Sequence, residues 1–77
     1  MRVRVRLHGG LHIDLGMNSE MIELTPTQGP KVADIVRELG LRAEDVWLVS
    51  VNRNRVSNDF TVQNGDLIEI FPIVAGG

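Results

Sequence analysis

The residues whose types could do chemistry stand at the end of the sequence, in Ala75-Gly76-Gly77. They place a free α-carboxylate on two residues without side chains, and a backbone without Cβ atoms can approach a ligand closely. An arm of about six residues starting at Pro72 reaches roughly 20 Å when it is extended. We therefore predict that this arm enters a narrow active site on another protein, although a frayed chain end gives the same pattern.

No other residues form a pattern typical of catalysis. His8 and His12 lie four positions apart, but no further soft ligand accompanies them and the chain has no cysteine. We expect both histidines on the surface and no metal site. The serines lack a Gly-x-Ser-x-Gly elbow, and Gly9-Gly10 is not followed by a phosphate-loop pattern. The sequence therefore predicts no catalytic residue and no autonomous enzyme.

Size and charge narrow the function classes. A chain of 77 residues forms one small domain. Its formal net charge is −2, whereas a nucleic-acid-binding domain usually carries a basic patch. No apolar run is long enough to cross a bilayer, and the N-terminal residues lack the apolar stretch of a signal peptide. We expect a cytoplasmic protein without nucleic-acid or membrane partners.

The first third of the chain predicts strands. Residues 1–7 alternate arginine with aliphatic residues, the period of a strand with one buried face. The arginine stripe is expected to be the solvated face, with a docking surface for an acidic partner as the alternative. Residues 11–15 also alternate, so the segment 8–19 is open between a strand and a loop. Residues 21–25 predict another strand.

The last third predicts three more strands. The apolar run 46–51 is typical of a central strand, and we expect its Trp47 in the core. Residues 55–57 can pair back with it briefly. Asn64-Gly65 is a strong turn signal, after which residues 67–72 form the final strand.

One helix is predicted between these groups of strands. A single apolar stripe is formed by residues spaced at i, i+3, i+4 and i+7, namely Val32, Ile35, Val36 and Leu39. Pro30 suits the first helical turn, and Gly40 suits the left-handed residue that ends a helix. The pattern predicts a helix over residues 30–39.

This order of elements predicts an α+β fold. One amphipathic helix must bury its stripe on the apolar face of a mixed sheet, and we expect the first and last strands to be adjacent and parallel. The arrangement is a ubiquitin-like β-grasp, with four to five strands packed on one main helix. We predict a β-grasp domain over residues 1–72 and a flexible Gly-Gly tail over residues 73–77.

With these motifs, essentially the whole chain resembles the ThiS/MoaD family of sulfur carriers. The resemblance rests on Val51-Asn52, on Asn64-Gly65-Asp66 and on the closing run Phe-Pro-Ile-Val-Ala-Gly-Gly over residues 71–77. The aromatic-Pro approach and Gly9-Gly10 are closer to the small subunit of molybdopterin synthase, which favours molybdopterin over thiamine biosynthesis. Ile73 departs from that subfamily, which often has a second proline at this position.

The resemblance implies that Gly77 is the covalent carrier. An ATP-dependent activating enzyme (MoeB/ThiF-like), using ATP and Mg²⁺, adenylates its carboxylate, which then becomes a thiocarboxylate. The sulfur comes from a donor such as a cysteine desulfurase. The recipient is the large subunit of molybdopterin synthase or thiazole synthase. The carrier itself binds no cofactor.

Two further sets of residues are expected to meet these partners. Gly76, Ala75 and Val74 are the residues that thread into the partner. Leu67 and Phe71 are expected on the sheet face away from the helix, as a partner surface, with Phe71 in the core as the alternative.

Two other functions stay open. A ubiquitin-type protein modifier is joined through Gly77 to lysines of other proteins, and it needs the same adenylation. A non-catalytic β-grasp adaptor uses neither step.

Overall fold

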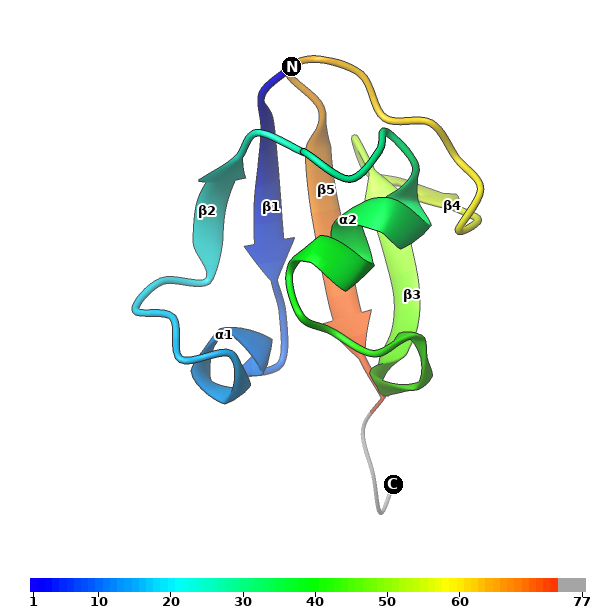
Figure 1. Cartoon of the computed structure of the whole chain (residues 1–77). Coiled ribbons are helices and arrows are strands. Elements are labelled where there is room, and N and C mark those ends of the chain that lie inside the picture. Colours follow the sequence, from blue (N-terminus) through cyan, green and yellow to red (C-terminus); the bar gives the residue numbers. More distant parts are fainter. Residues whose placement is uncertain (74–77) are drawn as a thin grey trace.

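A five-stranded mixed sheet packs against one main helix in the computed structural model, which describes residues 1–73 (Figure 1). The predictions for Val74, Ala75, Gly76 and Gly77 lie outside the described residues. The division into a domain over 1–72 and a tail over 73–77 therefore stays a prediction. No helix within residues 1–73 is long and apolar enough to cross a membrane.

The strands are arranged as the sequence predicted. They are β1 (Val3–Leu7), β2 (Met21–Leu24), β3 (Val46–Val51), β4 (Asn54–Val56) and β5 (Leu67–Pro72). Their order across the sheet is β2-β1-β5-β3-β4. The first and last strands are adjacent and parallel, with Val5 opposite Ile68, while the remaining neighbours are antiparallel. The predicted mixed β-grasp sheet is confirmed, and β5 lies at its centre.

The hydrophobic core lies between α2 (Val32–Glu38) and one face of the sheet. Alternate residues of β1 are buried and exposed along the whole strand, as its period of two predicted. The predicted helix stripe is also buried, with Ile35 completely inaccessible to solvent. Burial of these aliphatic side chains is the main force that holds the helix on the sheet.

The beginning of the helix differs from the prediction. The N-cap is Lys31, whose backbone N–H donates to the Asp34 carboxylate at 3.1 Å. Pro30 precedes this cap, so its predicted place in the first helical turn is wrong. The carboxylate satisfies an N–H group that has no partner within the helix, and the helix needs no proline to start.

The predicted end of the helix is confirmed. Gly40 has φ 86°, and its N–H donates to the Arg37 carbonyl at 3.0 Å. The N–H of Leu41 donates to the Val36 carbonyl at 3.1 Å. This pair of hydrogen bonds is the Schellman motif, in which a left-handed glycine ends a helix.

Of the two structures left open by the sequence, the segment 8–19 forms the loop, which is interrupted by one short helix. Gly9 and Gly10 both have positive φ, and they turn the chain into the short helix α1 (Leu11–Asp14). Leu11 is buried in the main core. The alternation that suggested a strand therefore belongs to a single helical turn, anchored by Leu11 and by the partly buried Leu15.

Trp47 is the clearest error of the sequence analysis, because its side chain is 63% exposed. The pairing between β3 and β5 shifts register between Val46 and Leu48. Trp47 is the extra residue of this bulge, so it leaves the alternation that was expected to bury it.

Candidate functional site

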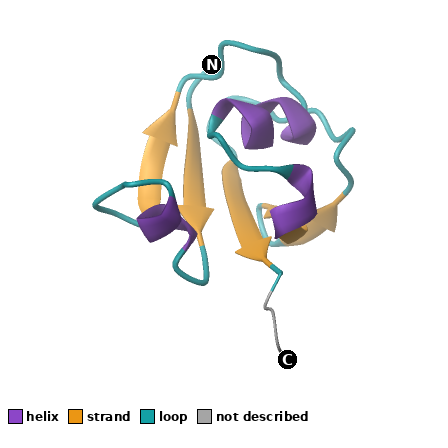
Figure 2. Cartoon of the chain, turned by 60° about the horizontal axis from the view of Figure 1, so that its bottom comes forward, coloured by secondary structure: helices purple, strands orange, loops and turns teal. Residues whose placement is uncertain are grey.

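The chain leaves the sheet at the end of β5 and continues toward Gly77, the predicted carrier residue. This end lies between α1 and the 3₁₀ helix η1 (Ala43–Asp45), as two views show (Figures 1 and 2). The N–H of Ile73 donates to the backbone carbonyl of Asp45 at 3.0 Å. The backbone of Ile73 is therefore hydrogen-bonded to η1, while its side chain is 54% exposed.

Phe71, two positions before Ile73, is held by an aromatic stack. The His8 and Phe71 rings lie parallel within 9°, with centroids 4.1 Å apart. Phe71 is partly buried and lies on the sheet face away from α2, because it alternates with the buried, inward-facing Ile70. The alternative, that Phe71 lies in the core, is therefore wrong, since Phe71 is not part of the core cluster. The imidazole ring covers part of Phe71 from outside.

A buried carboxylate positions this imidazole. The Glu69 side chain lies on the outer face, yet the residue is only 4% exposed. His8 Nε2 is 2.8 Å from Glu69 Oε2, and Arg53 Nε is 3.3 Å from Oε1. A buried carboxylate is tolerated when both oxygens have partners of this kind. We conclude that Glu69 holds the ring of His8 over Phe71.

Sequence reasoning missed this cluster, although one signal was available. The alternation of β5 places an acidic residue between two apolar ones on the outer face, and such a residue needs a partner. Which partner it finds depends on strand order, because His8 and Glu69 are 61 positions apart in the chain. The expectation that both histidines lie on the surface is wrong, because His8 and His12 are each partly buried.

The outer sheet face combines apolar groups with positive charge. Leu67 is partly buried there, next to the exposed Arg4 of β1. Arg4, Arg6 and Arg55 make no ion pair with any of residues 1–73. A chain with a net charge of −2 thus concentrates unpaired arginines on one face, which favours contact with an acidic surface.

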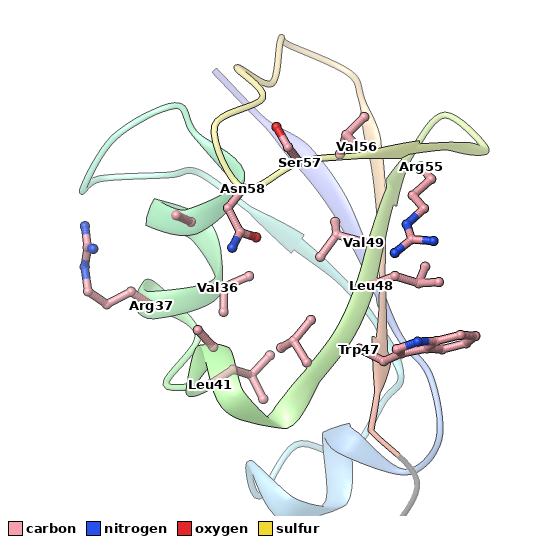
Figure 3. A pocket seen from close by; sticks show the side chains of 13 residues that line it. Val36, Arg37, Leu41, Trp47, Leu48, Val49, Arg55, Val56, Ser57 and Asn58 are labelled. Carbon is pink, nitrogen blue, oxygen red and sulfur yellow. The ribbon is translucent and has the colours of Figure 1, made fainter.

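A groove of about 500 Å³ lies elsewhere, between α2 and the strands β3 and β4 (Figure 3). Val36, Leu41 and Val49 point into it, while Arg37 and Trp47 point away. No pair of acidic and basic groups faces its interior. Within the part of the chain that the structure describes, no group of His, Cys, Asp or Glu could hold a metal ion.

The sequence matches the model of the ThiS family over residues 16–77. This chain belongs to the ThiS family. Carriers of the family are non-catalytic proteins that bind no cofactor. The coarse function is accordingly that of a ThiS/MoaD-like sulfur carrier or of a related small modifier, and not that of an enzyme.

Solved structures show the same fold. A putative molybdopterin converting factor, subunit 1, from Pyrococcus furiosus is 25% identical, with a TM-score of 0.74 over 96% of this chain and 99% of that chain. SAMP1 from Haloferax volcanii is 18% identical, with a TM-score of 0.75 over 100% of both chains. A complex of subunits 1 and 2 of molybdopterin-converting factor from Helicobacter pylori 26695 matches at 20% identity, with a TM-score of 0.65 over 100% of both chains.

For this member of the ThiS family, the structure brings together only some of the predicted site residues. Phe71 and Leu67 share the outer face of β5, at the positions expected for a partner surface. Their role in binding stays a prediction. Val74, Ala75, Gly76 and Gly77 lie outside the described residues, so the geometry that bears on the site is that of the anchor, residues 67–73.

Proposed function

We propose that this chain carries sulfur for cofactor biosynthesis, as a thiocarboxylate on Gly77. The main support for this proposal is the match to the ThiS family model, which includes the two C-terminal glycines. The closing sequence motif and the 25% identical Pyrococcus furiosus protein favour molybdopterin over thiamine. The reaction takes place in the cytoplasm, where ATP and a sulfur donor are available.

The proposed chemistry needs only the α-carboxyl group from this chain. That group has a reference pKa of roughly 3.3–3.7, so it is ionised at neutral pH. A carboxylate oxygen attacks the α-phosphorus of ATP, and pyrophosphate leaves. A persulfide sulfur of the donor then attacks the acyl carbon and displaces AMP, and a thiol cleaves the S–S bond of the resulting acyl disulfide to leave the thiocarboxylate and a new disulfide. The activating enzyme (MoeB/ThiF-like) supplies ATP, Mg²⁺ and the charge stabilisation, and a separate donor such as a cysteine desulfurase supplies sulfur.

The role of this chain is to present its end at a defined place. β5 pairs with β1 on one side and with β3 on the other, so the strand that leads to Gly77 is held along both edges. Val74, Ala75 and Gly76 then enter the partner's channel. The absence of a Cβ at Gly76 permits close approach next to the reacting carboxylate.

We also propose that the outer sheet face is where the partners dock. Its apolar residues Leu67 and Phe71 lie next to unpaired arginines, a combination that suits an apolar centre with an acidic rim. The Helicobacter pylori complex shows that subunit 1 of molybdopterin-converting factor binds a second subunit. The partners of this chain are then the activating enzyme and the large subunit of molybdopterin synthase, with thiazole synthase as the alternative.

Intact-mass measurement of the protein from its own cells tests this proposal. We expect a species whose mass is increased by the exchange of one oxygen for sulfur, and we expect it to disappear when Gly77 is deleted. Conjugates to lysines of other proteins support the modifier function instead. A single unmodified mass, with neither product, contradicts both and leaves the adaptor.

A further inference from the structure

The loop after β1 contacts the end of β5 at a point where no side chain fits. Gly9 has φ 63°, and a Cβ built on it would lie 2.5 Å from Cγ and 3.0 Å from Cδ of Pro72. Contacts between a Cβ and another carbon essentially never come as close as the first of these. The ring of Pro72 therefore occupies the space that a side chain at residue 9 needs.

His8 and Gly9 make several contacts with the last residues of β5. The N–H of His8 donates to the Ile70 carbonyl at 2.9 Å, and its ring stacks on Phe71. Gly9 then contacts Pro72. Proline has no N–H to donate, so the contact between Gly9 and the Pro72 ring is a steric one.

From this geometry we propose that Gly9 is a positioning residue that sets the direction in which the chain leaves the sheet. The inference rests on the proposed function, because in that function the direction of the chain determines whether the terminal carboxylate reaches the activating enzyme. A side chain at residue 9 pushes the Pro72 ring aside. Pro72 and Ile73 border a hollow of about 500 Å³ together with Leu11 and Leu15, so the displaced ring has space to move into.

The neighbouring glycine provides a matched control. Gly10 also has a positive φ, 80°, but nothing lies within 4 Å of a Cβ built on it. An alanine at either position pays the strain of a left-handed backbone. Only Gly9→Ala adds the contact with Pro72, so the difference between the two variants measures the effect of that contact.

The first experiment measures ATP–pyrophosphate exchange with the activating enzyme from the same organism. We expect Gly9→Ala to lower kcat about 10- to 100-fold, since a displacement of about 1 Å near reacting groups can cost about 100-fold. KM should stay unchanged, because the docking face is intact. Gly10→Ala should behave like the wild type. Equal kcat values for the two variants, or an effect confined to KM, would overturn the inference.

Removal of the ring provides a rescue test. Pro72→Ala alone should lower kcat several-fold by loosening the contact. Combined with Gly9→Ala, it should restore the activity of the Pro72→Ala single variant, because the clashing Cγ and Cδ atoms are gone. Additive losses in the double variant, or an unchanged Pro72→Ala, would contradict a steric role. The Pro72→Ala variant also decides the question if Gly9→Ala does not fold.

A second measurement does not depend on activity. The residual dipolar coupling of the Ile73 N–H reports the orientation of the last described residue relative to the sheet. We expect it to change in Gly9→Ala and to stay constant in Gly10→Ala. An unchanged coupling in Gly9→Ala refutes the inference whatever the exchange assay shows. Absence of exchange with the wild-type protein, together with the expected coupling change, refutes the proposed function and leaves the positioning role of Gly9 standing.

Discussion

The two faces of the sheet have different chemistry although the same strands form them. In β5, Ile68 and Ile70 face the helix and are 1% and 0% exposed. Leu67, Glu69 and Phe71 alternate with these isoleucines and face outward. There Glu69 contacts His8 and Arg53, and Phe71 stacks on His8. Successive side chains of a strand point to opposite faces. A single strand can therefore hold the fold together with one set of residues and present a partner surface with the other.

This comparison teaches where function can change without loss of the fold. The inner face is uniformly aliphatic, so any change in volume there disturbs close packing. The outer face already contains a buried carboxylate, that of Glu69, whose partners are the polar side chains of His8 and Arg53. We expect inner-face variants to change stability and outer-face or terminal variants to change activation.

The largest effect is expected at the end of the chain, which belongs to neither face. Deletion of Gly77 withdraws the carboxylate by roughly 3.5 Å, so we expect ATP–pyrophosphate exchange to fall below detection. The melting temperature should stay constant, because the described core lies within residues 3–70. Normal exchange by the shortened protein would contradict Gly77 as the carrier residue.

The second effect separates the two faces on β5 itself. Ile70→Ala should lower the free energy of unfolding by about 2–5 kcal/mol, the usual cost of removing a fully buried aliphatic side chain. Leu67→Ala, on the outer face of the same strand, is the control and should cost much less. Urea denaturation measures both. Equal losses would mean that the outer face contributes to stability as the inner face does.

The third effect concerns the charge of the outer face. Arg4→Glu should raise the KM for the activating enzyme up to about fivefold, because exposed ion pairs contribute about 0.2–1 kcal/mol. The increase should shrink as salt is added. Lys31→Glu, at the helix cap, changes the net charge by the same amount and should leave KM unchanged. The same increase in both variants would show that only net charge matters.

The smallest effect lies on the helix side and appears only in acid. Hydrogen bonds from the backbone N–H of Thr27 and from that of Gln28 hold the pKa of Glu38 below its ordinary value of 4.5. Stability from this ionised group is therefore present above pH 4.5 and is lost as the pH falls through the folded-state pKa, below 4.5.

Glu38→Gln should accordingly flatten the acid limb of the urea midpoint measured against pH. Glu20→Gln is the control, because the Glu20 carboxylate makes no hydrogen bond or ion pair with residues 1–73. An acid limb that is equally steep in the wild type and in Glu38→Gln would show that the hydrogen bonds of Glu38 do not stabilise the fold.

The sequence by itself determined the elements whose residues are close together in the chain. The alternation in residues 3–7, the apolar stripe of α2 and the glycine that ends this helix were all predicted and confirmed. Each depends on a local period or a single backbone conformation. The order of elements also predicted the parallel pair of the first and last strands, because a β-grasp leaves them no other place.

Only the tertiary structure decided which distant residues meet. Trp47 points outward because β3 bulges where it pairs with β5, and His8 finds Glu69 because β1 lies beside β5. The contact of Gly9 with Pro72 has the same origin. The packing of the whole sheet sets the register and the neighbours of each strand, so a local sequence pattern cannot predict them.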